Sequence, residues 1–135
     1  MQDYHQLKVW ELSHHFAVGI FKISRSFPKE ELYGITSQVR RAAFSIPINI
    51  AEGCGRHTSK DFAHFLDIAM GSASEVEEEL LILRDIDFLD RKTHAVQDEE
   101  IKKIKMMIAK LIDAVRGNGG SSDNEVSPPN DKSII

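Results

Sequence analysis

The stretch that decides the fold runs from Gly34 to Gly53 and reads GITSQVRRAAFSIPINIAEG. Its apolar residues recur at spacings of three and four, which places them on one face of a helix. That face consists of Ile35, Val39, Ala42 or Ala43, Ile46 and Ile50. We expect it to form part of a core. We also expect a bend at Pro47, because proline lacks the amide that would bond to the Ala43 carbonyl.

A polar stripe follows the same helix about a quarter of a turn away. We call it the polar ridge, and it consists of Gln38, Arg41, Ser45, Asn49 and Glu52. Ser and Asn are poor helix formers, so an ordinary solvated face does not explain them. We therefore expect a structured polar contact between helices or between subunits. Antiparallel packing of the following helix predicts that Glu75 joins the ridge by pairing with Arg41.

Three further segments show the same helical spacing of apolar residues. The predicted helices cover about residues 8–26, 32–53, 59–87 and 98–116. Pro28 ends the first helix, Ser59 is the expected N-cap of the third, and Asp98 with two following glutamates opens the fourth. No strand pattern competes. Four amphipathic helices joined by short loops predict an all-α, up-down-up-down antiparallel four-helix bundle.

The predicted bundle occupies residues 1–116 as one domain, which is large enough to bury a core without disulfides or metal. Residues 117–135, GNGGSSDNEVSPPNDKSII, are rich in Gly, Ser, Asn and Pro, so we expect a disordered tail. Cys54 is the only cysteine, which favours a reducing compartment. Because we recognise neither a signal peptide nor a membrane-spanning apolar run, we expect a cytoplasmic protein.

Charge is unevenly distributed, although the net charge is only −4. Residues 1–60 carry eight Lys and Arg against five Asp and Glu, whereas residues 61–116 carry eight against thirteen. This asymmetry suits a basic patch for a polyanion and equally suits a basic helix packed on an acidic one. The sequence pI near 5.8 favours the second interpretation. Candidate contacts to RNA or DNA are Lys22, Arg25, Lys29, Arg40, Arg41, Arg56 and Lys60.

The sequence offers candidate catalytic and metal-ligating residues, but each group lacks a required member. His57, Asp61 and His64 have helical spacing but lack a fourth ligand. The acidic run at residues 75–79 lacks the Glu-x-x-His motif of carboxylate-bridged metal bundles, which favours a solvated face with one or two interhelical pairs. Cys54 lacks an oriented base and an oxyanion site. We therefore expect no enzyme activity, no cofactor and no metal site.

Several blocks of the sequence resemble one protein family. They are LKVW at 7–10, FPKEE at 27–31, QVRRAAFSIP at 38–47, NIAEG at 49–53, and Gly71-Ser72 with Glu75. Over about residues 5–116 the chain is similar to the bacterial four-helix bundle proteins, also called ribosomal RNA intervening-sequence proteins. This family is related to the accessory variability protein of diversity-generating retroelements. The resemblance implies a ring, typically a homopentamer, and no catalysis; in the retroelement branch the ring binds nucleic acid and a reverse transcriptase.

Two functions remain open at this point. The first is a non-enzymatic homo-oligomeric scaffold or adaptor with a protein partner, pentameric as the resemblance implies. The second is an RNA- or DNA-binding ring that uses a basic band on the first two helices. A second apolar line predicts a subunit contact near the polar ridge, because a lone bundle needs only one buried stripe per helix. This line consists of Trp10, Ala17 and Phe21 on the first helix and Ile82 beside Leu83 on the third.

Overall fold

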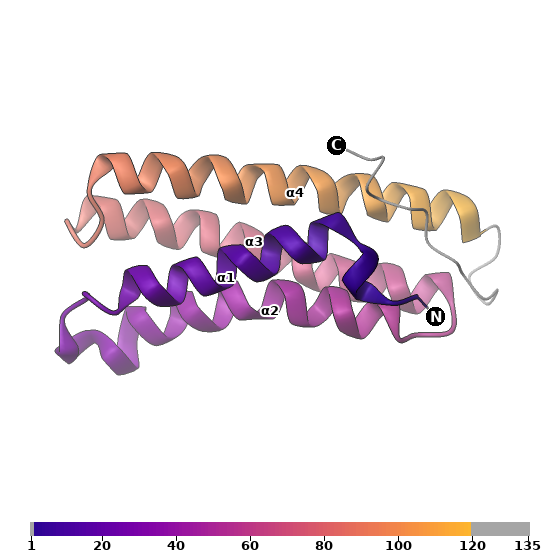
Figure 1. Cartoon of the computed structure of the whole chain (residues 1–135), viewed down its shortest axis with the longest axis horizontal. Coiled ribbons are helices and arrows are strands. Elements are labelled where there is room, and N and C mark those ends of the chain that lie inside the picture. The colour runs from indigo at the N-terminus through magenta and orange to yellow at the C-terminus, as the bar shows by residue number, and fades with distance from the viewer. Residues whose placement is uncertain (1, 120–135) are drawn as a thin grey trace.

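The computed structural model describes residues 2–119, which form four long helices (Figure 1). The helices are α1 (Lys8–Ser24), α2 (Ser37–Cys54), α3 (Ser59–Asp85) and α4 (Arg91–Gly119). The 3-10 turn η1 (Tyr4–Gln6) precedes α1, and η2 (Lys29–Glu31) with the π-helical turn η3 (Leu32–Thr36) leads into α2. No strand occurs between residues 2 and 119, and the all-α prediction is confirmed.

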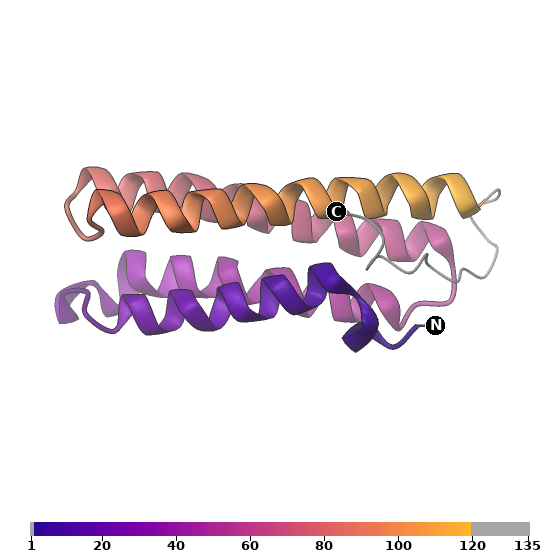
Figure 2. The ribbon, with the colours of Figure 1, turned by 45° about the horizontal axis from the view of Figure 1, so that its top comes forward.

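The helices alternate in direction along the chain, which is the predicted up-down-up-down order (Figure 1). Each helix packs on the one before it, and α4 also contacts α1 and closes the bundle. Figure 2 shows α1 with α2 as one layer and α3 with α4 as the other. Short connections impose this order, because a helix that follows within a few residues must return along its predecessor.

The core lies along the bundle axis, where each helix contributes one apolar face. The predicted face of α2 is buried there: Val39, Ala43, Ile46 and Ile50 have no measurable exposure, and Ala42 is 5% exposed. Residues three and four apart share a face of the helix, so one stripe per helix is enough to fill this space. α2 continues through Pro47 to Cys54, and the bend expected at the proline remains a prediction.

The start of α3 agrees with the prediction, but the capping residue does not. The Thr58 side chain, rather than that of Ser59, accepts a 3.1 Å hydrogen bond from the Asp61 amide. Thr58 has extended backbone angles, as an N-cap requires, whereas Ser59 is already helical and buried. The prediction was wrong by one residue, because both residues carry a hydroxyl that is able to cap.

The fourth helix begins earlier than the predicted start at Asp98. Its cap is Asp90, whose carboxylate accepts a 2.6 Å hydrogen bond from the Thr93 amide, and helical structure begins at Arg91. α4 extends to Gly119, past the predicted domain end at residue 116. The rest of the predicted tail lies outside the described residues.

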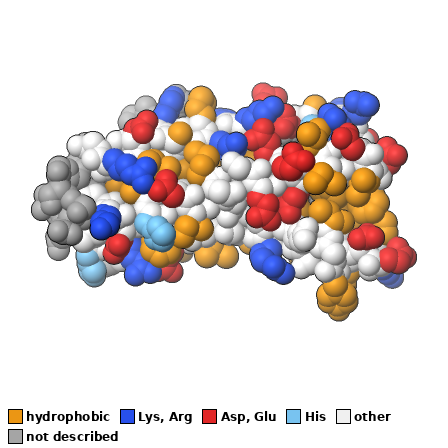
Figure 3. All heavy atoms as spheres, turned by 180° about the vertical axis from the view of Figure 1, so that it is seen from behind, with side chains coloured by type: hydrophobic (Ala, Val, Ile, Leu, Met, Phe, Trp, Pro, Cys, Tyr) orange, Lys and Arg blue, Asp and Glu red, His pale blue; other side chains and the backbone are white. Residues whose placement is uncertain are grey.

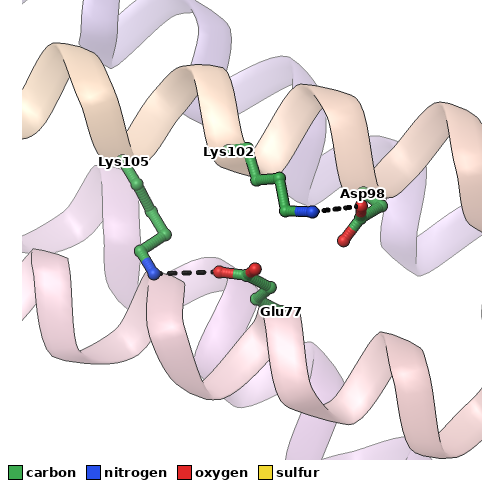
Figure 4. A network of polar contacts seen from close by, with 4 residues as sticks. All are labelled: Glu77, Asp98, Lys102 and Lys105. Carbon is green, nitrogen blue, oxygen red and sulfur yellow. Dashed lines mark hydrogen bonds and ion pairs between the residues drawn. The ribbon is translucent and has the colours of Figure 1, made fainter.

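α3 and α4 are joined by an ion pair between the predicted acidic run and the lysines of α4 (Figure 4). The Lys105 ammonium lies 2.8 Å from a carboxylate oxygen of Glu77, and both side chains are half-buried. Lys102 pairs with Asp98 at the same distance within α4. The expected interhelical pair in the acidic run is thus present.

Candidate functional site

A largely apolar groove of about 640 Å³ runs along the outer face of α2. Tyr33 is 94% exposed and Ile48 is 62% exposed, and Leu32 and Phe44 are also exposed. Large apolar side chains left in water over this length mark a contact surface. We call it the α2 groove, and its lining residues are Leu32, Tyr33, Ser37, Arg40, Arg41, Phe44, Ser45, Ile48 and Asn49.

Leu32 and Tyr33 of the groove lie in η3, the π-helical turn before α2. The sequence analysis predicted a continuous helix from about residue 32 instead. The backbone at Gly34 has φ −105° and ψ −118°, outside the helical region, and α2 proper starts at Ser37. Ile35 therefore lies only at the edge of the core, while Tyr33, on the other side of Gly34, projects into solvent. Apolar periodicity gives no information on such a turn, so the sequence did not identify Tyr33 as the most exposed aromatic residue of the groove.

The polar ridge makes the predicted structured contact at its centre. Ser72 on α3 donates a 2.8 Å hydrogen bond to the Ser45 hydroxyl, and the Asn49 amide donates to the same hydroxyl and to the Ser45 carbonyl, both at 2.8 Å. These bonds link α2 to α3. At the end of the ridge Glu52 forms a 3.1 Å ion pair with Arg56, four residues further on.

The predicted Arg41–Glu75 pair is wrong for the described chain. Both side chains are exposed, and no ion pair joins them among residues 2–119. The Ser45–Ser72 contact does bring Arg41 and Glu75 to a similar height along the bundle, because α2 and α3 are antiparallel. Equal height is not enough, since both side chains lie exposed to solvent and do not meet across the two helices.

Glu79 is the titratable group that the sequence did not single out. It is 6% exposed, and its Oε1 atom is buried without a hydrogen-bond partner. Burial raises the pKa of Glu79 to about 7, and the neighbouring Glu75 carboxyl adds to this rise. The i, i+4 spacing of two glutamates was the available signal in the sequence.

The predicted basic residues separate into two groups. Lys22, Arg25, Lys29, Arg40 and Arg41 lie where α1 ends and α2 begins, and the other two, Arg56 and Lys60, lie at the α2–α3 turn. The sixteen residues from Arg40 to Arg56, just past the end of α2, correspond to roughly 24 Å of helix. A continuous basic band on helices 1 and 2 is therefore not formed.

Three of these cations are also engaged in packing, and the first, Arg25, lies 5.3 Å from the centre of the Phe21 ring. The Arg40 Nε atom donates a 2.7 Å hydrogen bond to the Ser24 hydroxyl, and its guanidinium lies 4.3 Å from the centre of the Phe21 ring. Arg56 lies 4.5 Å from the centre of the Phe65 ring, in addition to its ion pair with Glu52. Such contacts hold the side chains in place and account for part of the basic charge without a polyanion.

The predicted second apolar line is only partly at the surface. Ala17 is buried in the core, so its assignment to a subunit contact was wrong, while Phe21 is half-buried. Trp10 packs against Tyr4 with ring centres 5.1 Å apart, and both line a smaller groove of about 410 Å³. Ile48 lines this groove as well as the α2 groove, so the two form one continuous surface.

On α3, Ile82 is 40% exposed, as the second apolar line requires. Figure 3 shows the molecule from the side on which α2 and α3 lie in front. Hydrophobic side chains gather there at the end opposite the residues drawn in grey, and acidic side chains lie beside them.

Comparison with known proteins assigns this bundle to a family. Residues 5–110 match the model of a family described as 23S rRNA-intervening sequence protein. The chain belongs to this family. Among solved structures, it is similar to a protein with unknown function from the S23 ribosomal protein family of Bacteroides thetaiotaomicron VPI-5482. The identity is 25% and the TM-score 0.73, over 78% of this chain and 95% of the other. No curated protein matches the chain.

In this intervening-sequence protein the described residues form exposed apolar surfaces on α2 and α3. Between residues 2 and 119, no group of three or more His, Cys, Asp or Glu side chains is arranged to hold a metal ion. None of the helices in the described part of the chain is long and apolar enough to cross a membrane. The α2 groove with the neighbouring face of α3 is therefore the candidate functional site.

Proposed function

We propose that this protein is a non-enzymatic scaffold or adaptor that assembles with copies of itself through the α2 groove. The observation that carries the proposal is the set of large apolar side chains left exposed there, above all Tyr33 and Ile48. A single bundle buries one stripe per helix and has no use for a second apolar surface. Burying these side chains against another copy would remove their apolar area from water.

We further propose a ring of five subunits. The support is the similarity to ring-forming four-helix bundle proteins, in blocks that include QVRRAAFSIP and NIAEG on α2 itself. A cyclic ring uses two different faces of each subunit, and the bundle offers the outer face of α2 and the adjoining face of α3. Repetition round a ring also turns weak single contacts with a partner into strong ones, as a scaffold requires.

Sedimentation equilibrium of the full chain tests the assembly. We expect a mass near five times the chain mass of 15.2 kDa at micromolar concentration and physiological salt. A single species at the mass of one chain would overturn the proposal, and a stable species of another size would overturn the pentamer alone.

A matched pair of variants locates the contact. Ile48→Asp places a charge in the α2 groove, and Val96→Asp places one at a comparably exposed position on α4, since the two side chains are 62% and 57% exposed. We expect Ile48→Asp to dissociate the assembly and Val96→Asp to leave it intact. Assembly of both variants at wild-type strength would exclude the α2 groove as the contact.

The alternative function is binding of RNA or DNA by the ring. The observation that favours it is the group of cations near the α1–α2 connection, where Lys22, Arg25 and Lys29 are exposed. Filter binding of total bacterial RNA at 50 and 200 mM salt tests this function. Affinity for phosphates should fall steeply with salt, and Lys22→Glu combined with Lys29→Glu should weaken binding at least tenfold. Lys103→Glu on α4 is the control, and equal binding by all variants would exclude this site.

A further inference from the structure

α3 carries a mixed apolar and acidic line beside the α2 groove. The spacing of its residues alternates between four and three, which keeps them on one face of the helix. Ser72 belongs to this line, and its hydrogen bond to Ser45 shows that the line adjoins α2. We call it the α3 ridge, and it consists of Ile68, Ser72, Glu75, Glu79, Ile82 and Ile86. The three isoleucines are 39%, 40% and 46% exposed.

The α2 groove and the α3 ridge carry the same pattern with opposite charge. On α2, Arg41 lies seven residues before the exposed Ile48, and the exposed Tyr33 lies on its other side, in η3; on α3, Glu75 lies between the exposed Ile68 and Ile82. Within each helix a separation of seven residues corresponds to roughly 10 Å. A cation flanked by apolar residues on one surface thus matches an anion flanked by apolar residues on the other.

The heights of these residues along the bundle also match. α2 and α3 are antiparallel, and the Ser45–Ser72 hydrogen bond fixes their register. Counting outward from this contact places Arg41 level with Glu75, and Ile48 level with Ile68. A ring whose axis runs parallel to the helices preserves height from one copy to the next. The α2 groove of one copy then meets the α3 ridge of the next with both of these levels aligned.

Within residues 2–119 neither Arg41 nor Glu75 forms an ion pair with an opposite charge, and both side chains are exposed. Arg41 also lines the α2 groove. Glu79, four residues after Glu75, is buried and offers no counter-charge. A guanidinium has five N–H donors in a fixed plane and is able to bond both oxygens of one carboxylate at once.

We infer that Arg41 of one copy binds the exposed Glu75 carboxylate of the next copy, while Tyr33 and Ile48 pack on the isoleucines of the α3 ridge. The inference rests on the proposed self-assembly and names the contact that holds it together. The outer face of α2 and the α3 ridge are adjoining faces of one bundle, so each subunit can use both at the same time, as a closed ring requires.

Charge reversal tests the contact, because Arg41 and Glu75 are exposed and tolerate substitution in the folded chain. We expect Arg41→Glu and Glu75→Arg each to raise the dissociation constant of the assembly at least tenfold, measured by sedimentation at pH 7.5. Lys103→Glu and Glu99→Arg, at exposed positions on α4, are the matched controls and should assemble as wild type. Far-UV circular dichroism verifies that every variant remains helical.

Mixing the two single variants distinguishes a contact between copies from one within a chain. An equimolar mixture of Arg41→Glu and Glu75→Arg places opposite charges together at interfaces between unlike copies, so it should sediment above the monomer when each variant alone does not. The double variant should assemble by itself. A pair within one chain would be restored in the double variant but never in the mixture.

The outcomes separate this inference from the proposed function. A monomeric wild type would overturn both. An assembled wild type with either single variant assembling equally well would overturn only the Arg41 contact and leave the scaffold proposal standing. Loss of assembly in both single variants without recovery in the mixture would also overturn the contact between copies.

Discussion

Ser72 on α3 donates a 2.8 Å hydrogen bond to Ser45 on α2, although 27 residues separate them in the chain. Ser45 also accepts a bond from Asn49, so one hydroxyl joins a polar group on its own helix to one on the neighbouring helix. A polar contact at a fixed level favours one register of two helices over its neighbours, as single polar residues do in coiled coils. This contact aligns the α2 groove with the α3 ridge.

The first prediction concerns this contact. Ser72→Ala removes the donor while Ser45 keeps its bond from Asn49, so we expect a loss of about 1 kcal/mol in the free energy of unfolding. Ser45→Ala removes the acceptor of both bonds and should cost about 1 to 2 kcal/mol. The double variant should lose less than the sum of the two, because both substitutions break the same bond. Urea unfolding measures all three.

Ser74→Ala, at an exposed position on α3, is the control and should change stability by less than about 0.5 kcal/mol. Strictly additive effects of Ser45→Ala and Ser72→Ala would show that the hydrogen bond contributes nothing to stability.

The second prediction compares two helical glycines. A Cβ atom at Gly53 would lie 2.9 Å from Phe62 Cδ1 and 3.1 Å from Phe65 Cβ, whereas one at Gly71 would have nothing within 4 Å. Gly53→Ala should therefore destabilise the protein by about 1 to 2 kcal/mol, because α2 and α3 must separate to admit the methyl group. Gly71→Ala should stabilise it by about 0.5 to 1 kcal/mol through helix propensity. Thermal unfolding measures both variants. If Gly53→Ala and Gly71→Ala changed stability equally, the close approach of α2 and α3 at Gly53 would be contradicted.

The third prediction concerns the end of α3. Asp87 has φ 67°, and its amide bonds to the Arg84 carbonyl while that of Phe88 bonds to the Leu83 carbonyl. This is a Schellman motif with aspartate at the left-handed position where glycine is preferred. Asp87→Gly should stabilise the protein by about 0.5 to 1 kcal/mol, which urea unfolding detects.

Asp85→Gly provides the control for this substitution, because Asp85 is the last helical residue of α3 and is also exposed, with an ion pair to its neighbour Arg84. Glycine there should destabilise by up to about 1 kcal/mol. If glycine changed stability in the same direction at positions 85 and 87, the effect at Asp87 would not come from its left-handed backbone conformation.

The sequence predicted the helices well where apolar spacing was strong, as along Val39, Ala43, Ile46 and Ile50. It failed at the start of α4, because the segment from Arg91 to Asp98 has few apolar residues and only the Asp90 cap shows where the helix begins. Spacing reports which face is buried. It does not report local capping bonds between neighbouring residues.

The candidate site was predictable only in part. Ser45 and Asn49 stood out because both are poor helix formers. In the structure their side chains form a hydrogen bond with each other, and Ser45 accepts one from Ser72 on α3. The pairing of Arg41 was not predictable, because sequence spacing gives the height of a side chain but not the direction in which it points. The exposure of Tyr33 depends on the turn at Gly34, which no periodic pattern encodes.

The last prediction concerns Glu79. In the folded protein the pKa of Glu79 is about 7, raised from an ordinary value of 4.5 by burial and by Glu75. Between pH 4.5 and 7, therefore, the Glu79 carboxyl is protonated in the native state and deprotonated in the unfolded chain. Stability from this group is fully present below pH 4.5 and is lost as pH rises through 7. The size of this loss is on the order of 3 kcal/mol.

Glu79→Gln isolates this effect, because the amide has the same shape, carries no charge at any pH and is able to donate a hydrogen bond to Glu75. Asp90 acts in the opposite sense: hydrogen bonds with Thr93 lower its pKa, so its stabilisation is lost in acid. Asp90 is present in both wild type and Glu79→Gln, so its contribution cancels in the difference between their free energies of unfolding. The free energies of unfolding of wild type and Glu79→Gln, measured at a concentration where both are monomeric, should be closest at and below pH 4.5 and diverge in favour of the variant as pH rises to 8. Glu78→Gln, at the exposed neighbouring position, should follow the wild-type profile, and parallel profiles for wild type and Glu79→Gln would show that Glu79 titrates normally.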